Sequence, residues 1–130
     1  MIDKFFAFDS FEGLPETLKE EDGYFESGTF CTSEKDFKKL VKKNTGRTLS
    51  KENVIAGFYE DSLNKDLCVR LPKIGVLHID VDLYSSTKTV LNFVKPLLVD
   101  GSGILFVDFY CFKPTVPFGE NKALLEFLSD

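Results

Sequence analysis

Two carboxylates separated by a single residue follow a short apolar segment in the middle of this 130-residue chain. Asp80 and Asp82 come directly after Ile74–Ile79, which is too short for a helix and is predicted to be a strand buried on both faces. Such burial favours a parallel sheet covered by helices, and these sheets bind ligands at the carboxyl ends of their strands. One aspartate could cap the helix expected to begin near Thr87, but capping does not require two. The pair is therefore a candidate functional site.

Acids follow three further predicted strands in the same way. Phe5–Phe8 is followed by Asp9, Asn53–Ala56 by Asp61, and Ile104–Val107 by Asp108. Because parallel strands end at the same edge of a sheet, these acids and the first pair are expected to lie along one rim. For Asp9 the sequence leaves two interpretations equally open. Its carboxylate can accept hydrogen bonds from a ribose diol, or it can brace its own turn.

Helical patterns alternate with these strands. We expect a helix that begins at the cap Ser33 and ends at Asn44 and Gly46, with two more over 87–98 and 120–128. Glu16–Thr32 is expected to be a long functional loop and Asp100–Gly103 a turn, while the single histidine, His78, is expected to pack in the core. The alternation predicts one α/β sandwich domain with a mainly parallel sheet.

Composition excludes several classes of function. The formal net charge is −5, and the sequence has no row of Lys and Arg residues of the kind that binds a phosphate backbone. Both features argue against nucleic acid as a partner. The densest basic stretch, Lys35–Lys43, has the spacing of a solvated helix face. No apolar segment has the length of a membrane span, and no signal peptide opens the chain. Three cysteines, Cys31, Cys68 and Cys111, have no paired or metal-binding spacing and suit a cytoplasmic protein.

Five motifs occur in a recognisable order along nearly the whole chain. They read FDSFEGLPE from Phe8, GFYEDSL from Gly57, HIDVDLYSSTK from His78, DGSGILFVDFYCF from Asp100 and GENKALLEFL from Gly119. Together they resemble the macrocin O-methyltransferase family. This resemblance implies a class I enzyme that transfers the methyl group of S-adenosylmethionine to a hydroxyl, expected to be that of a sugar or a glycosylated small molecule.

The resemblance also implies a fold. Family members have a Rossmann-like three-layer sandwich with strand order 3-2-1-4-5-7-6, and the four predicted strands here match strands 2 to 5. Strand 1 with its glycine-rich loop and strands 6 and 7 have no counterpart, so residues 1–130 are expected to form a partial methyltransferase domain. The missing strand 1 would leave a gap in the sheet and weaken binding of S-adenosylmethionine.

Residue roles follow from the same resemblance. Asp82 is the expected general base, and Asp80 and Asp108 are the expected Mg²⁺ ligands, although Val107 stands where the family has another aspartate in an ungapped alignment. The residues expected to contact the cofactor are Asp9, Ser10, Gly57, Phe58 and Asp80. A homo-oligomer is possible on this basis. The alternative is a non-catalytic α/β module that binds a nucleoside or a partner and transfers nothing.

Overall fold

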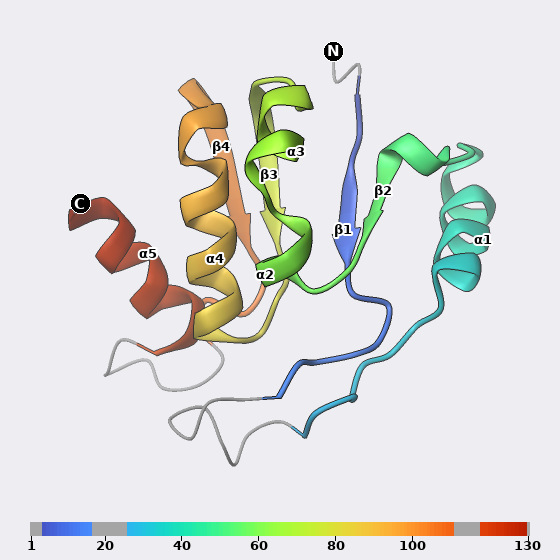
Figure 1. The fold of residues 1–130 in the computed structure, drawn as a ribbon, viewed down its shortest axis with the longest axis horizontal. Coiled ribbons are helices and arrows are strands. Elements are labelled where there is room, and N and C mark those ends of the chain that lie inside the picture. The colour runs from blue at the N-terminus through green and yellow to red at the C-terminus, as the bar shows by residue number, and fades with distance from the viewer. Residues whose placement is uncertain (1–3, 17–25, 111–117, 130) are drawn as a thin grey trace. The chain divides into compact units, whose positions relative to one another are not determined.

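The computed structural model describes residues 4–16, 26–110 and 118–129. The chain divides into two compact units, Met1–Ser62 and Leu63–Asp130, and each is described here by itself. Every strand of both units lies in a parallel pair, with helices between the strands along the chain (Figure 1). The predicted α/β class with parallel strands is therefore confirmed.

The first unit is organised around a short parallel pair. Strand β1, Ala7–Asp9, lies beside β2, Val54–Ala56, with Asp9 opposite Ala56. A 3₁₀ turn, Lys51–Asn53, leads into β2, and helix α2, Tyr59–Ser62, follows it where a loop was expected. The two strands begin later than the apolar segments suggested, because pairing and not hydrophobicity sets their bounds.

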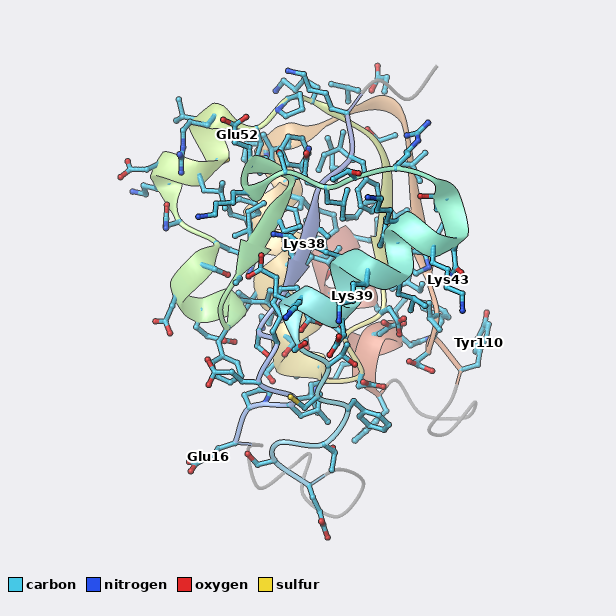
Figure 2. All side chains as sticks on the ribbon, turned by 90° about the vertical axis from the view of Figure 1, so that its right-hand side faces the viewer. Glu16, Lys38, Lys39, Lys43, Glu52 and Tyr110 are labelled. Atoms are coloured by element: carbon cyan, nitrogen blue, oxygen red, sulfur yellow. The ribbon has the colours of Figure 1, made fainter. Side chains whose placement is uncertain are left out.

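Helix α1, Glu34–Thr45, begins and ends as its sequence predicts. The Ser33 hydroxyl accepts a hydrogen bond from the backbone N–H of Asp36, and Gly46 closes the helix in the left-handed conformation that glycine adopts without strain. Figure 2 shows Lys38, Lys39 and Lys43 along this helix. Lys38 and Lys39 form ion pairs with Glu34 and Asp36 one turn away, so the basic stretch is the solvated face of a helix.

The segment after β1 is held by backbone hydrogen bonds to a distant turn. The N–H of Leu14 donates to Thr29 and the N–H of Gly28 donates back to Leu14, at 3.0 and 2.9 Å. Gly13 approaches that turn so closely that a Cβ atom would lie 2.6 Å from the Gly28 carbonyl carbon. Residues 26–32 contain no helix or strand, as expected of a loop, and residues 17–25 lie outside the described residues.

The second unit contains a longer parallel pair and the larger helices. Strand β3, Ile74–Ile79, has the predicted bounds, and β4, Leu98–Phe106, lies parallel to it. The helices of this unit are α3, Lys65–Arg70, α4, Tyr84–Val94, a 3₁₀ turn, Lys95–Leu97, and α5, Gly119–Ser129. Helix α3 was not predicted, and α4 begins three residues before Thr87. Figure 1 shows α5 alongside α4.

The core of this unit lies on one face of the β3–β4 pair. Ile79 is 1% exposed, and it is buried together with Leu91 of α4 and Ala123 of α5. The opposite face is open: Val76 is 55% exposed, and His78 is also exposed. The expectations of a strand buried on both faces and of a core histidine are therefore wrong, because the described helices of this unit bury only one side of the pair.

Strand β4 runs through the segment that was expected to be a turn. The Ser102 hydroxyl accepts a hydrogen bond from the N–H of Val99 and donates one to the carbonyl oxygen of Ile74, at 2.9 and 2.6 Å. The register changes from Ile74 opposite Leu98 to Val76 opposite Gly103, so residues 99–102 form an irregular bulge inside the strand.

In the described part of each unit the sheet has two strands, so every strand has a single neighbour. Among the described residues, β1 pairs only with β2, and β3 pairs only with β4. In the part of the chain that the structure describes, no helix has the length and apolar character needed to span a membrane.

Candidate active site

Neither aspartate after β3 caps the helix that follows. Helix α4 begins at Tyr84, its N-cap residue is Leu83, and no side chain forms a capping hydrogen bond there. Leu83 is buried, so the cap position serves packing and leaves the first turn without a polar cap. The capping interpretation of Asp80 and Asp82 is therefore wrong, and their presence needs another reason.

The backbone of Asp82 is held in an unusual conformation. Its φ is 57°, in the left-handed region that residues with a Cβ atom seldom adopt. The N–H of Leu83 donates to the carbonyl oxygen of Val81 at 2.5 Å, which closes a three-residue turn around Asp82. Conformations of this kind cost of order 1–3 kcal/mol and gather at functional sites.

The Asp82 carboxyl group lies beside a second carboxyl group at the end of β4. Burial, the charge of Asp108, a hydrogen bond to Asp108 and the charge of Asp80, in decreasing order of effect, together raise the pKa of Asp82 to about 6. All three aspartates thus meet in one cluster at the carboxyl ends of two parallel strands. Within this unit the predicted convergence of acids is confirmed. That Asp9 joins the same rim stays a prediction.

A fourth carboxyl group, which the sequence did not indicate, lies beneath this cluster. Glu120 near the start of α5 is 0% exposed, and its Oε2 accepts a hydrogen bond from the backbone N–H of Asp108 at 3.0 Å. Its pKa is raised to about 7: burial is the main cause, the backbone of Asp108 and Val81 partly offsets it, and the charges of Asp108 and Asp80 add to it. An acid after glycine at a helix start is common, so its spacing carries no signal of this role.

Val107 precedes Asp108 and continues the strand pairing beyond β4. Its N–H donates to the carbonyl oxygen of Ile79 at 3.0 Å, and its side chain is 50% exposed. A carboxylate at this position would therefore not be buried in the core.

In the first unit, the predicted cofactor contacts gather where β1 and β2 end. The N–H of Gly57 donates to the carbonyl oxygen of Asp9 at 3.0 Å, which joins the two strand ends. The Asp9 carboxylate accepts a hydrogen bond from the N–H of Phe11 at 2.6 Å, and the Ser10 hydroxyl donates to the carbonyl oxygen of Gly13 at 2.8 Å. Phe58 begins the turn into α2. Asp9 therefore braces its own turn through Oδ1, and its exposed carboxylate has a second oxygen.

The geometry does not provide the metal site that the resemblance implies. Among residues 4–16, 26–110 and 118–129, no three Asp, Glu, His or Cys side chains are placed to hold one metal ion. A Mg²⁺ ion prefers six oxygen ligands in near-octahedral geometry. Asp82 and Asp108 instead turn toward each other and share a hydrogen bond. The arrangement does not fit a protein-held Mg²⁺ site, and the assignment of Asp80 and Asp108 as its ligands stays a prediction.

The arrangement does fit proton transfer. A carboxyl group with a pKa of about 6 is largely ionised at neutral pH and is still basic enough to accept a proton in a transition state. Asp82 is only partly buried, so an acceptor molecule can reach it. The sequence profile of the macrocin O-methyltransferases (TylF) matches residues 2–121. The chain belongs to the macrocin O-methyltransferase family.

A solved structure supports this membership at the level of the fold. The chain is similar to the O-methyltransferase NovP, with a TM-score of 0.72 and 22% sequence identity over 98% of this chain. The match covers 52% of the NovP chain, so this member of the macrocin O-methyltransferase family spans about half the length of that protein. A comparison with curated proteins finds no match.

Proposed function

We propose that this chain carries the proton-accepting part of an S-adenosylmethionine-dependent O-methyltransferase that acts on a hydroxyl group of a sugar or glycosylated small molecule. The observation that carries the proposal is Asp82: it caps no helix, it adopts a left-handed conformation, and its pKa is raised to about 6. Membership of the macrocin O-methyltransferase family supports the reaction class.

Asp82 performs the central step in this proposal. A sugar hydroxyl is too weak an acid to ionise at neutral pH, so its proton must leave as its oxygen attacks. Asp82 accepts that proton while the new O–CH₃ bond forms. S-adenosylmethionine, when bound, supplies the methyl group and leaves as S-adenosylhomocysteine after its C–S bond breaks. Orientation of the hydroxyl beside Asp82 supplies a further part of the rate.

The nucleoside of the cofactor is proposed to bind at the ends of β1 and β2. The free oxygen of the Asp9 carboxylate is suited to accept a hydrogen bond from a ribose hydroxyl. Ser10, Gly57 and Phe58 lie in the same strand-to-loop connections, and Asp80 is proposed as a further contact. The positive φ of Gly57, 128°, lets the backbone turn sharply at this edge.

Three further features belong to this proposal. Mg²⁺ enters only as an ion to be tested, since no step above depends on it. The acceptor is a small molecule and not a nucleic acid, in keeping with the net charge of −5. The unpaired spacing of the cysteines supports a cytoplasmic location, and the two described cysteines, Cys31 and Cys68, are free thiols.

The test is a methyl-transfer assay with S-adenosylmethionine labelled in its methyl group, at millimolar concentration, against a panel of sugars and glycosides. The unaltered chain is expected to label an acceptor hydroxyl, and Asp82→Asn is expected to bind the same ligands without transfer. Binding of S-adenosylhomocysteine without transfer by the unaltered chain would support the non-catalytic module instead. Equal transfer by both proteins would remove Asp82 from the mechanism.

A further inference from the structure

The Glu120 carboxyl group is connected to both loops that carry the acid cluster. Its Oε2 accepts the N–H of Asp108 at the end of β4, and the backbone of Val81 lies close enough to the same carboxyl group to lower its pKa. Val81 lies between Asp80 and Asp82. One side chain of α5 therefore contacts the backbone of both strand ends.

Burial makes these contacts strong. Glu120 is 0% exposed, and its Oε1 has no hydrogen-bond partner among the described residues. Leaving a buried carboxyl oxygen unsatisfied is costly, so stability alone does not account for an acid at this position. An apolar side chain of similar size would be the more stabilising choice for a site that only packs.

We propose that Glu120 is the positioning residue of the acid cluster: it holds the backbone of Val81 and Asp108 so that the Asp82 and Asp108 carboxyl groups face each other. The loop after β3 contains the left-handed Asp82, a conformation that persists only when its surroundings hold it. Glu120 supplies that restraint from below, and Asp108 supplies the carboxyl partner. The catalytic part of this role rests on the proposed function; the structural part does not.

The test compares Glu120→Gln with Glu120→Ala in the full chain. Gln keeps an oxygen in place of Oε2 and can accept the Asp108 N–H, whereas Ala removes the acceptor. Glu126→Ala is the matched control, because Glu126 lies on the same helix and accepts a hydrogen bond from the Tyr84 hydroxyl, away from both loops. Among the described residues, the Glu126 carboxylate accepts hydrogen bonds only from the Tyr84 and Lys88 side chains of α4, so the control reports the effect of loosening α5 against α4 without removing a contact to the loop backbone.

Amide hydrogen exchange at Val81 and Asp108, measured by NMR, reads the restraint directly. Glu120→Ala is expected to speed exchange at the Asp108 amide about 10-fold or more, since a hydrogen bond to a carboxylate contributes about 1.5 kcal/mol or more, and to speed exchange at Val81 by a smaller factor. Glu120→Gln is expected to restore protection from exchange at the Asp108 amide. Glu126→Ala is expected to leave the exchange rates of these two amides, relative to those of the other amides of β3 and β4, unchanged. Equal exchange in Glu120→Ala and Glu126→Ala would overturn the proposal.

Methyl transfer supplies the second measurement. Glu120→Ala is expected to lower kcat about 10-fold or more with little change in KM for either substrate, and Glu120→Gln is expected to recover most of that loss. A loss of kcat that is equal in the Gln and Ala variants would count against positioning. If the unaltered chain transfers no methyl group, the proposed function fails while the exchange measurement still decides the role of Glu120.

Discussion

The carboxyl groups of Asp82 and Asp108 share a hydrogen bond at the ends of two neighbouring parallel strands. A shared hydrogen bond requires that one of the two be protonated, and a pKa of about 6 for Asp82 makes that state common in mildly acidic solution. The pair is therefore a proton-binding unit whose charge changes just below neutral pH.

Stability is expected to fall as pH rises from about 4 to about 7. The pKa of Glu120 is raised to about 7 and that of Asp82 to about 6, so the folded chain holds protons that the unfolded chain releases. The protonated Glu120 and Asp82 contribute their full stabilisation at pH values below the pKa values of the unfolded chain. That stabilisation is lost as pH rises through the pKa values of the folded chain. The groups facing Glu120 are Asp108 and Asp80. Because both are acids, their negative charges add to the loss of stability as pH rises.

The measurement is urea unfolding of the unaltered chain and of Glu120→Gln at pH 5 and pH 8. The unaltered chain is expected to lose stability of order 2 kcal/mol over this range, and the Gln variant clearly less. A stability of the unaltered chain that stays constant or increases would contradict the raised pKa values.

Methyl transfer is expected to depend on ionised Asp82. The rate should rise with pH through about 6 and level off near neutrality, because the base must lose its proton before it can accept another. Asp82→Asn is expected to lower kcat about 10²- to 10⁴-fold, with far-ultraviolet circular dichroism unchanged. A pH profile that is flat from 5 to 8 would assign the base to another group.

Gly13 and Gly28 form a matched pair for substitution by alanine. Both have positive φ, 84° and 78°, so each change introduces backbone strain of about 1 kcal/mol or more. A Cβ atom at Gly13 also meets backbone at 2.6 Å, whereas one at Gly28 meets nothing within 4 Å. Gly13→Ala is expected to destabilise the chain by about 1–3 kcal/mol more than Gly28→Ala, measured by thermal unfolding. Equal losses of stability in the two variants would mean that the loop shifts to make room for the Cβ atom at residue 13.

Asp9 is tested by substitutions that separate bracing from binding. Asn keeps one oxygen for the Phe11 N–H and loses the second carboxylate oxygen, whereas Ala loses both. If Asp9 also binds ribose, Asp9→Asn should keep the stability of the unaltered chain but weaken binding of S-adenosylhomocysteine about 10-fold. Calorimetry checks the affinity. An unaltered affinity in Asp9→Asn would leave bracing as its role.

Val107→Asp tests the metal ligand that the family alignment suggests. Val107 is 50% exposed, so the new carboxylate is expected to be tolerated, with a stability change within about 1 kcal/mol. Titration with Mg²⁺ should then show tighter binding than in the unaltered chain, because a third carboxylate joins Asp80 and Asp108. A variant that folds normally and binds Mg²⁺ no more tightly would show that the ungapped alignment of this stretch is wrong.

The sequence predicted the helices and strands whose bounds are set by residues within or next to them. The bounds of β3 follow from a short apolar segment that begins and ends with isoleucine, and both ends of α1 follow from Ser33 and Gly46. The beginning of β4 did not follow, because Asp100–Gly103 has the composition of a turn. Only the hydrogen bond from Ser102 to Ile74, 28 residues away, reveals that this segment is part of the strand.

The acid cluster was predictable in part for the same reason. Asp80, Asp82 and Asp108 each follow a strand, and the topology of parallel strands brings them together. Glu120 belongs to a helix and reaches the cluster only because α5 folds back against α4. The cap at Leu83 was equally hidden, since a buried apolar cap gives no polar signal at the start of a helix.

The single neighbour of β3 has a practical consequence for anyone who purifies this chain. Among the described residues β3 is paired along one edge only, and an unpaired strand edge is a template for intermolecular pairing. Val76 on β3 is also 55% exposed. Pro72 and Lys73 discourage intermolecular pairing only in the segment that precedes β3, since neither lies within Ile74–Ile79. Soluble yield and light scattering should therefore depend on protein concentration, and a charge placed at Val76 should delay the onset of aggregation.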